Sequence, residues 1–250
     1  MDKQNSEIVK LVQFPAMFGL PNASTYCMKV ETFMRIAGIP YEIIEEVNPS
    51  KGPKGKLPYI IHKGKEIPDS SFILEYLSSE FNIDLDSHLS IQEKAVAHSF
   101  QRLFEESLIW VMAYNRMNDN WHVIESAWFG FLPPVLKMFL PSMLRQQFKS
   151  KLQAQGIGRH SRNEIYHYGM KDLRAIVDQL GAKPFLMGDR VSLVDTTAYA
   201  FISSLLIDEF TSPLDELSKT AENLRAYRER MQNLYFPELS YSRRDDFAVV

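Results

Sequence analysis

The chain has 250 residues, of which 45% are hydrophobic, and this is enough for a packed core in one large or two small domains. The formal charge at pH 7 is −3, and Lys and Arg are scattered along the chain, so the composition gives no basic field for nucleic acid. The single cysteine and an N-terminus without the apolar core of a signal peptide predict a cytoplasmic protein. The most apolar stretch, 129–144, contains Lys137 and prolines and is shorter than the roughly 18 apolar residues of a membrane-spanning helix, so we expect no transmembrane segment.

The first part of the chain alternates between strand and helix patterns. Residues 8–14 (IVKLVQF) are β-rich and lead through a Pro/Gly/Asn loop into a segment that becomes helical at Ser24. From there apolar residues recur at three- and four-residue steps until Gly38, which predicts a helix of about four turns. Residues 41–47 (YEIIEEV) predict a second strand, parallel to the first because a helix connects them.

A hairpin and another helix complete this part. Residues 57–67 (LPYIIHKGKEI) predict a hairpin around a Lys-Gly-Lys turn, and the next helix is predicted to start near Asp69. The resulting βαβ-ββα order predicts an α/β N-terminal domain over residues 1–82. After a short polar link, apolar residues keep helical spacing, which predicts an all-helical C-terminal domain over 90–236 and a polar tail at 237–250.

Several short motifs resemble one known superfamily. The loop-to-helix segment Ser24-Thr25-Tyr26-Cys27, the Lys56-Leu57-Pro58 before the hairpin and the Asp69-Ser70 pair at a helix start resemble the thioredoxin-like N-terminal domain of glutathione transferases. The segments STYCMKVETFMRIAGIPYE, GIGRHSRNEI and GAKPFLMGDRVSLVDTTAYAF are similar to the failed-axon-connections/metaxin-like branch of that superfamily. The resemblance covers roughly residues 8–236. One departure is Thr25, where that branch usually has proline.

The resemblance implies that Ser24 faces the sulfur of glutathione and is the catalytic residue. A helix N-terminus carries about +0.5 charge and unpaired N–H donors, so a hydroxyl placed there can help to lower a thiol pKa from about 8.5 toward neutrality. From the residues alone, a serine that only caps the helix would look the same. Cys27 lies where dithiol oxidoreductases of this fold have their resolving cysteine, but with serine at the first position we favour a buried, structural role.

The resemblance also implies a set of glutathione ligands. A cis bond before Pro58 would turn the N–H and C=O of Leu57 toward the cysteinyl backbone of glutathione, with Lys56 at the glycyl carboxylate. Ser70 would hold the carboxylate of the γ-glutamyl group, and Asp69 would lie near its ammonium. Without the resemblance, Lys56 is equally well a solvated loop lysine, and Asp69 and Ser70 are helix caps.

Aromatic residues on and after the first long helix of the second part suggest a substrate pocket. In glutathione transferases the electrophile lies between that helix and the N-terminal domain, which makes Tyr114 and Trp121 candidates for its lining. An aromatic stripe at helical spacing is, however, more often core than pocket. The apolar stretch 129–144 is compatible with a lid, a dimer contact or a membrane-surface patch.

The remaining polar motifs point to folding rather than chemistry. Ser192-Leu193-Val194-Asp195 has the form of a capping box and is predicted to be a folding element outside the site. A second box at 161–164 follows Arg159 and His160, which either meet an acidic ligand or subunit or belong to a solvated helix start. The six histidines show no metal-ligand spacing, and the sequence has no phosphate-binding glycine loop, so neither metal nor nucleotide chemistry is predicted.

Together these features predict a protein that binds glutathione and activates its thiol for conjugation to, or reduction of, a hydrophobic electrophile, as in detoxification. The alternative is a non-catalytic scaffold or interaction protein that keeps the glutathione-transferase fold. The predicted partners are glutathione and a hydrophobic small molecule, with no metal and no nucleic acid. A homodimer is left open.

Overall fold

The computed structural model describes residues 8–130 and 132–239. Within them the chain forms two compact units, which are described separately. The first unit comprises the described parts of residues 1–98, 182–204 and 225–250, and the second comprises 99–181 and 205–224. Most of the predicted polar tail, 240–250, lies outside the described residues.

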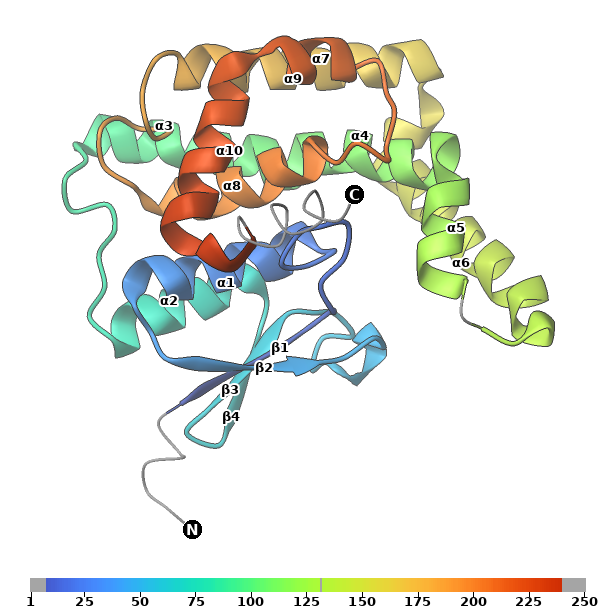
Figure 1. The fold of residues 1–250 in the computed structure, drawn as a ribbon, viewed down its shortest axis with the longest axis horizontal. Helices are drawn as coiled ribbons and strands as arrows, with labels where there is room; N and C mark the ends of the chain where they lie inside the picture. The colour runs from blue at the N-terminus through green and yellow to red at the C-terminus, as the bar shows by residue number, and fades with distance from the viewer. Residues whose placement is uncertain (1–7, 131, 240–250) are drawn as a thin grey trace, which may run out of the picture. The chain divides into compact units, whose positions relative to one another are not determined.

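A small mixed sheet forms the base of the first unit (Figure 1). Its strands have the order β2-β1-β3-β4, with β1 parallel to β2 and the other neighbours antiparallel. The strands are β1 (Val9–Gln13), β2 (Tyr41–Glu45), β3 (Tyr59–His62) and β4 (Lys65–Pro68). The predicted βαβ-ββα order is therefore confirmed, with the parallel pair joined by a helix and the antiparallel pair by a tight turn.

Helices α1 (Thr25–Ala37) and α2 (Ser70–Glu80) both lie on one side of this sheet (Figure 1). Val9 and Leu11 point to the same face because side chains alternate along a strand, and they pack with Phe33 of α1 and Leu77 of α2. Gly38 ends α1 with φ 66°, a left-handed conformation that glycine adopts without steric cost. The helix thus stops where the sequence predicts.

A polar cluster ties the helical layer to the sheet. The buried carboxylate of Glu31 on α1 accepts hydrogen bonds from the Gln13 side chain at 2.9 Å and from the Tyr41 hydroxyl at 2.9 Å. The Arg35 guanidinium pairs with Glu31 at 3.0 Å and with Glu238 at 2.7 Å. Because Glu238 follows the last long helix, this cluster joins the two ends of the chain's first unit.

The first unit also includes most of α3 (Ile91–Arg102), most of α8 (Leu193–Leu205) and most of α10 (Glu222–Tyr235). Asp195 at the start of α8 is fully buried and accepts hydrogen bonds from the backbone N–H of Leu186, the N–H and hydroxyl of Ser192 and the hydroxyl of Tyr227, all at 2.7–3.0 Å. Asp195 acts as a folding element, but the predicted capping box is only half formed: the Ser192 N–H donates to the Asp195 carboxylate, whereas the Asp195 N–H donates to the Ser192 carbonyl oxygen and not to its hydroxyl. Asp195 joins a loop and two helices through one carboxylate.

The described residues of the second unit contain only helices and their connections, as predicted. The first long helix that the apolar spacing of the second part predicts is interrupted by π-helical turns, which helical spacing in a sequence does not reveal. None of the described helices is long and apolar enough to cross a bilayer. The helical elements between α2 and α8 are α3 (Ile91–Arg102), η3 (Leu103–Leu108), α4 (Ile109–Tyr114), η4 (Asn115–Asp119), α5 (Trp121–Phe129), α6 (Pro134–Gln155), η5 (Ile157–Arg159) and α7 (Arg162–Leu180). Helix α9 (Asp215–Thr220) lies between α8 and α10.

Replacing Asp195 with alanine should destabilise the protein by about 3–5 kcal/mol, because several buried donors lose their acceptor at once. Urea denaturation of the Asp195→Ala variant measures this loss. Asp178→Ala, which removes an exposed carboxylate from α7, is the matched control and should change stability by less than about 0.5 kcal/mol. Equal midpoints for the two variants would contradict a structural role for Asp195.

Candidate functional site

The strand register brings the predicted glutathione-binding segments to one edge of the sheet. Tyr59 at the start of β3 lies opposite Val12 near the end of β1 and opposite Pro68 at the end of β4. The loop after β1, the segment before β3 and the loop after β4 therefore leave the sheet at the same edge. These three segments carry Ser24, the Leu57–Pro58 pair and the Asp69–Ser70 pair.

Ser24 is half-buried and forms the N-cap of α1, with its hydroxyl oxygen accepting from the Cys27 N–H at 3.4 Å. Asn22 holds the chain just before it. The Asn22 side-chain oxygen accepts from the Ser24 N–H at 2.9 Å, and its amide nitrogen donates to the carbonyl of Phe14. Our sequence reading missed Asn22, although an asparagine two residues before a helix cap is a known signal for such a side-chain turn.

Cys27 is buried one turn into α1, where it packs with Val12 and Leu57. Burial raises the pKa of its thiol from 9.0 to about 12, more than the nearby Ser24 hydroxyl and Phe14 backbone lower it. At neutral pH the thiol therefore stays protonated and is a poor nucleophile. This environment agrees with the structural role that the sequence favours for Cys27.

The segment before β3 has a cis peptide bond between Leu57 and Pro58, as the resemblance implies. Both residues are buried, whereas Lys56 just before them is exposed. The contact between Leu57 and Cys27 places this segment against the first turn of α1. The start of α1 and the cis-proline segment are therefore neighbours in the first unit.

Asp69 and Ser70 begin α2. Asp69 has φ 78° and ψ 123°, a conformation that non-glycine residues rarely adopt, and its carboxylate accepts from the Ser71 N–H at 3.1 Å. Such backbone conformations are enriched at ligand sites. Ser70 is 7% exposed and follows directly, with its side chain beside α1.

Lys29 is a residue of this region that our sequence reading did not single out. Its side chain is fully buried on α1, and its ammonium donates to the hydroxyl of Ser71 at 3.1 Å and to that of Ser70 at 3.5 Å. A buried lysine is uncommon, but the sequence shows only that it falls between apolar helix positions. Its serine partners lie 41 and 42 residues further along the chain, so no local pattern connects them.

The polarity of these contacts decides what the start of α2 can bind. An ammonium group only donates hydrogen bonds, so the two serine hydroxyls accept from Lys29 and keep their own protons for another acceptor. The first N–H groups of a helix are donors as well, and the helix dipole favours negative charge there. The region around Ser70 is therefore suited to a carboxylate rather than to a cation.

Tyr114 and Trp121 belong to the second unit, where each packs against other aromatic or cationic side chains. Tyr114 ends α4 and meets the ring of Tyr166 edge-on at 6.1 Å, and burial raises the pKa of its hydroxyl, which remains a neutral donor. Trp121 is buried, with the Arg145 guanidinium 5.5 Å from its ring. Their role as pocket lining stays a prediction.

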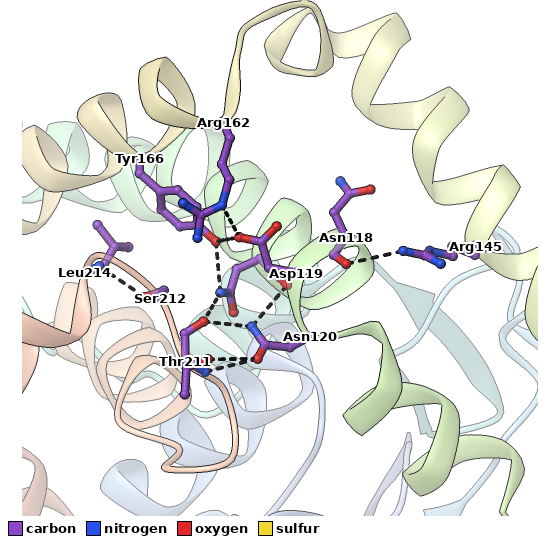
Figure 2. A network of polar contacts seen from close by, with 10 residues as sticks. Asn118, Asp119, Asn120, Arg145, Arg162, Tyr166, Thr211, Ser212 and Leu214 are labelled. Carbon is purple, nitrogen blue, oxygen red and sulfur yellow. Dashed lines mark hydrogen bonds and ion pairs between the residues drawn. The ribbon is translucent and has the colours of Figure 1, made fainter.

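A polar network fixes the π-helical turn that follows Tyr114, as Figure 2 shows. The carboxylate of Asp119 accepts from the Arg162 guanidinium and from the Tyr166 hydroxyl, both at 2.8 Å. The Asn120 side chain pairs with the N–H of Thr211 at 3.1 Å and with its carbonyl at 2.8 Å. The network thus joins this turn to α7 and to the loop before α9.

Two further predictions concern the start of α7 and metal binding. The capping box between Ser161 and Glu164 is present, and Arg159 and His160 before it are exposed. The His160 ring lies 4.0 Å from the Glu164 carboxylate. Over residues 8–130 and 132–239, no group of three His, Cys, Asp or Glu side chains is placed to hold a metal ion.

The family of the chain follows from sequence comparison. Residues 25–121 match the family of glutathione S-transferase N-terminal domains, and residues 169–231 match that of glutathione S-transferase C-terminal domains. Isoprene-epoxide–glutathione S-transferase from Rhodococcus sp. is 30% identical over 87% of the chain and 95% of its own length. The chain belongs to the glutathione transferase family.

Other relatives lie in the branch that the sequence motifs suggest. Failed axon connections from Drosophila melanogaster is 34% identical over 93% of the chain, and the chain spans 59% of its length. Metaxin-1 from Mus musculus is 29% identical over 88% of the chain and 73% of its own length. The predicted resemblance to this branch is therefore confirmed.

Solved structures support the fold. Glutathione transferase GSTFuA3 from Phanerochaete chrysosporium has a TM-score of 0.63 at 18% identity, covering 91% of this chain and 97% of its own. A glutathione transferase family member from Pseudomonas fluorescens, solved with two glutathione bound, has a TM-score of 0.58 at 16% identity, covering 94% of both chains. At these identities the similarity establishes the fold alone.

The burial of Cys27 leads to a prediction about its reactivity and about alkaline stability. The native thiol should resist alkylation at pH 8, whereas the unfolded chain should react fully. Because the folded-state pKa is raised, the unfolded state loses this proton first as pH rises above 9, so stability should fall between pH 9 and about 12. Urea denaturation at a series of alkaline pH values measures the fall.

The Cys27→Ala variant separates this effect from other titrating groups. It should be less stable than the wild type at pH 8 because of the cavity, but its stability should fall less steeply above pH 9. Parallel pH profiles for the two proteins, or rapid alkylation of the native thiol, would show that Cys27 is not held in a buried, protonated state.

Proposed function

We propose that the chain binds glutathione at the edge of the first unit's sheet and activates its thiol. The observation that supports this most is the convergence of Ser24, the Leu57–Pro58 pair and Ser70 on one edge, with the buried ammonium of Lys29 behind the last of them. The family of the chain adds to this, since one structural neighbour was solved with glutathione bound.

The γ-glutamyl end of glutathione fits the start of α2. Its α-carboxylate can accept hydrogen bonds from the Ser70 hydroxyl and from the first N–H groups of the helix. The Lys29 ammonium donates to the Ser70 hydroxyl oxygen, so the hydroxyl proton can be donated to the carboxylate. Lys29 also adds positive charge near this carboxylate. The exposed carboxylate of Asp69 is available for the ammonium of the same group.

The middle and the thiol of the peptide fit the other two segments. The backbone N–H and C=O of Leu57 would pair with the cysteinyl backbone, and Lys56 would meet the glycyl carboxylate. This pairing extends the peptide toward the start of α1, where the Ser24 hydroxyl would donate to the thiolate. Catalysis then consists of keeping the sulfur deprotonated at neutral pH.

The second substrate is proposed to be a hydrophobic electrophile that the thiolate attacks or that glutathione reduces. The relative from Rhodococcus sp. is named for the transfer of glutathione to isoprene epoxide, a small apolar electrophile. Tyr114 and Trp121 remain candidates for the lining of this substrate's pocket. A neutral Tyr114 hydroxyl would be able to donate to an oxygen of such a molecule.

The alternative function is a glutathione-transferase-like scaffold that has no catalytic role. Several relatives, Failed axon connections and metaxin-1 among them, have names that state no reaction. In this case the first unit would bind glutathione or a protein segment without turnover. Binding of glutathione without any reaction across a broad panel of electrophiles would favour the scaffold.

Ser70→Ala should weaken glutathione binding by about 10- to 100-fold, because a hydrogen bond to a charged group contributes roughly 1.5–3 kcal/mol. Lys29→Met should weaken it by a similar factor and should also reduce the preference for glutathione over an analogue whose γ-glutamyl carboxylate is an amide. Isothermal titration calorimetry with both ligands measures these changes.

Lys65→Met, which removes an exposed lysine from β4, is the matched control and should bind like the wild type. Circular dichroism shows whether Lys29→Met remains folded. If the wild type gives no heat at millimolar glutathione, the proposed function is wrong. If Lys29→Met binds both ligands like the wild type, the proposed role of Lys29 is wrong, but the proposed function is not affected.

Ser24→Ala should raise the pKa of bound glutathione and lower the conjugation rate, since each pKa unit corresponds to about 1.4 kcal/mol between the protonation states. Cys27→Ala should affect mainly stability. Ser24→Cys would create a dithiol at redox spacing and should add disulfide-exchange activity. Thiolate absorbance of bound glutathione across pH measures the titration in all the variants.

The opposite pattern would overturn this assignment. If Ser24→Ala titrates like the wild type and Cys27→Ala abolishes turnover, the reacting group is Cys27. Unchanged titration and unchanged turnover in both variants would show that neither side chain acts on the glutathione sulfur.

A further inference from the structure

Charge is unevenly distributed in the second unit, which the whole-chain composition hides. Between Ser126 and Asn163 the chain has no Asp or Glu, although it carries −3 overall. The same segment contains Lys137, Arg145, Lys149, Lys151, Arg159 and Arg162. Helix α6 occupies most of this segment, and its exposed basic side chains include Lys149 and Lys151. The Lys and Arg residues are therefore less evenly scattered than the composition of the whole chain suggests.

The first half of α6 also exposes an unusual number of large apolar side chains. Phe139 is 62% exposed and Met138 66% exposed, although side chains of this size are normally buried. We call the following five residues the α6 apolar surface: Val135, Leu136, Met138, Phe139 and Met143, each at least 45% exposed. Contiguous apolar surfaces of this kind mark interaction sites.

The two features lie in sequence along one helix. The α6 apolar surface covers the first turns together with the exposed Lys137, and Pro141 interrupts the backbone hydrogen bonding in the middle of the helix. The exposed Lys149 and Lys151 follow in the second half. In Figure 1, α5 and α6 run side by side to a common end within the second unit, at which α6 begins. The apolar surface is thus at the tip of a helix pair, with positive charge further along it.

A second copy of this chain does not fit this surface well. In a symmetric dimer the same patch meets itself, so two acid-free, basic helices would face each other and their charges would repel. An anionic lipid surface satisfies both features, because acyl chains accept the apolar side chains and headgroups attract the lysines. Helix α6 need not span the bilayer for this, and the described helices contain no spanning candidate.

We propose that the tip of the α5–α6 pair binds peripherally to membranes that contain anionic lipids. The α6 apolar surface inserts among the headgroups, and Lys149 and Lys151 pair with lipid phosphates or carboxylates. A chain whose net charge is negative thereby reaches an anionic surface in one orientation, with α6 toward the lipid. This proposal is independent of glutathione binding.

Vesicle flotation of the full chain tests the proposal. The protein should float with vesicles of phosphatidylcholine and phosphatidylserine, bind pure phosphatidylcholine more weakly, and dissociate as salt rises. Phe139→Ser with Met143→Ser should weaken binding by at least about 10-fold, because the variant loses the favourable free energy of moving two large apolar side chains from water into the lipid. Lys149→Gln with Lys151→Gln should weaken it by about 30-fold on anionic vesicles only.

Ile91→Ser with Leu234→Ser is the matched control, because it removes apolar side chains that are at least as exposed from other helices and should leave flotation unchanged. Circular dichroism shows that each variant is folded. Flotation that is absent in the wild type, or equal in the wild type and in the Phe139/Met143 variant, would overturn the proposal. Analytical ultracentrifugation that finds a dimer dissociated by the Phe139/Met143 variant would overturn it too, in favour of self-association.

Discussion

The register of the small sheet is the constraint on which the candidate site depends. Tyr59 lies between Val12 and Pro68, and this pairing alone makes three loops from distant parts of the chain leave the sheet at one edge. A slip by one residue would turn the side chains of β3 to the opposite face and remove Ile60 from the core under the helices. Burial of Ile60 and its core neighbours therefore fixes the strand register, and the register fixes where the three loops leave the sheet. Core residues that do not touch a ligand thus determine where a ligand can bind.

The elements of the first unit follow from short-range signals, and this is why they could be predicted. Helix α1 has a polar cap, apolar spacing and a stop at Gly38, and the hairpin has a turn of the expected kind. Residue roles were harder to assign. The sequence motifs place Ser24 and Ser70 at helix starts, whereas the contact between Lys29 and Ser70 joins residues far apart in the chain and has no local pattern. Interruptions of the long helix by π-helical turns are equally invisible to periodicity, since the apolar spacing continues through them.

In both units a carboxylate that accepts several hydrogen bonds joins separate elements, and this carboxylate is buried in the first unit and half-buried in the second. In the first, Asp195 gathers donors from a loop and two helices, and Glu31 gathers them from two strands and its own helix. In the second, Asp119 does this for α7 and the turn after Tyr114. A buried carboxylate with several donors fixes directions as well as distances. Helix α1, which begins directly after Ser24, is thus joined to two strands of the sheet through Glu31.

The first unit is assembled from three separated stretches of the chain, and this affects how the protein is made. The ring of Tyr26 on α1 packs against Phe201, and the Arg35 guanidinium lies 4.2 Å from the ring of Phe236. On a ribosome that adds about 5–20 residues per second, the sheet and its first two helices emerge roughly 8–30 s before the last of these partners. During that interval the nascent chain presents the uncovered side of α1 to the surrounding solution. Chaperone binding at this stage would therefore depend on how fast the helical segment between the first stretch of the unit and the two later ones is translated.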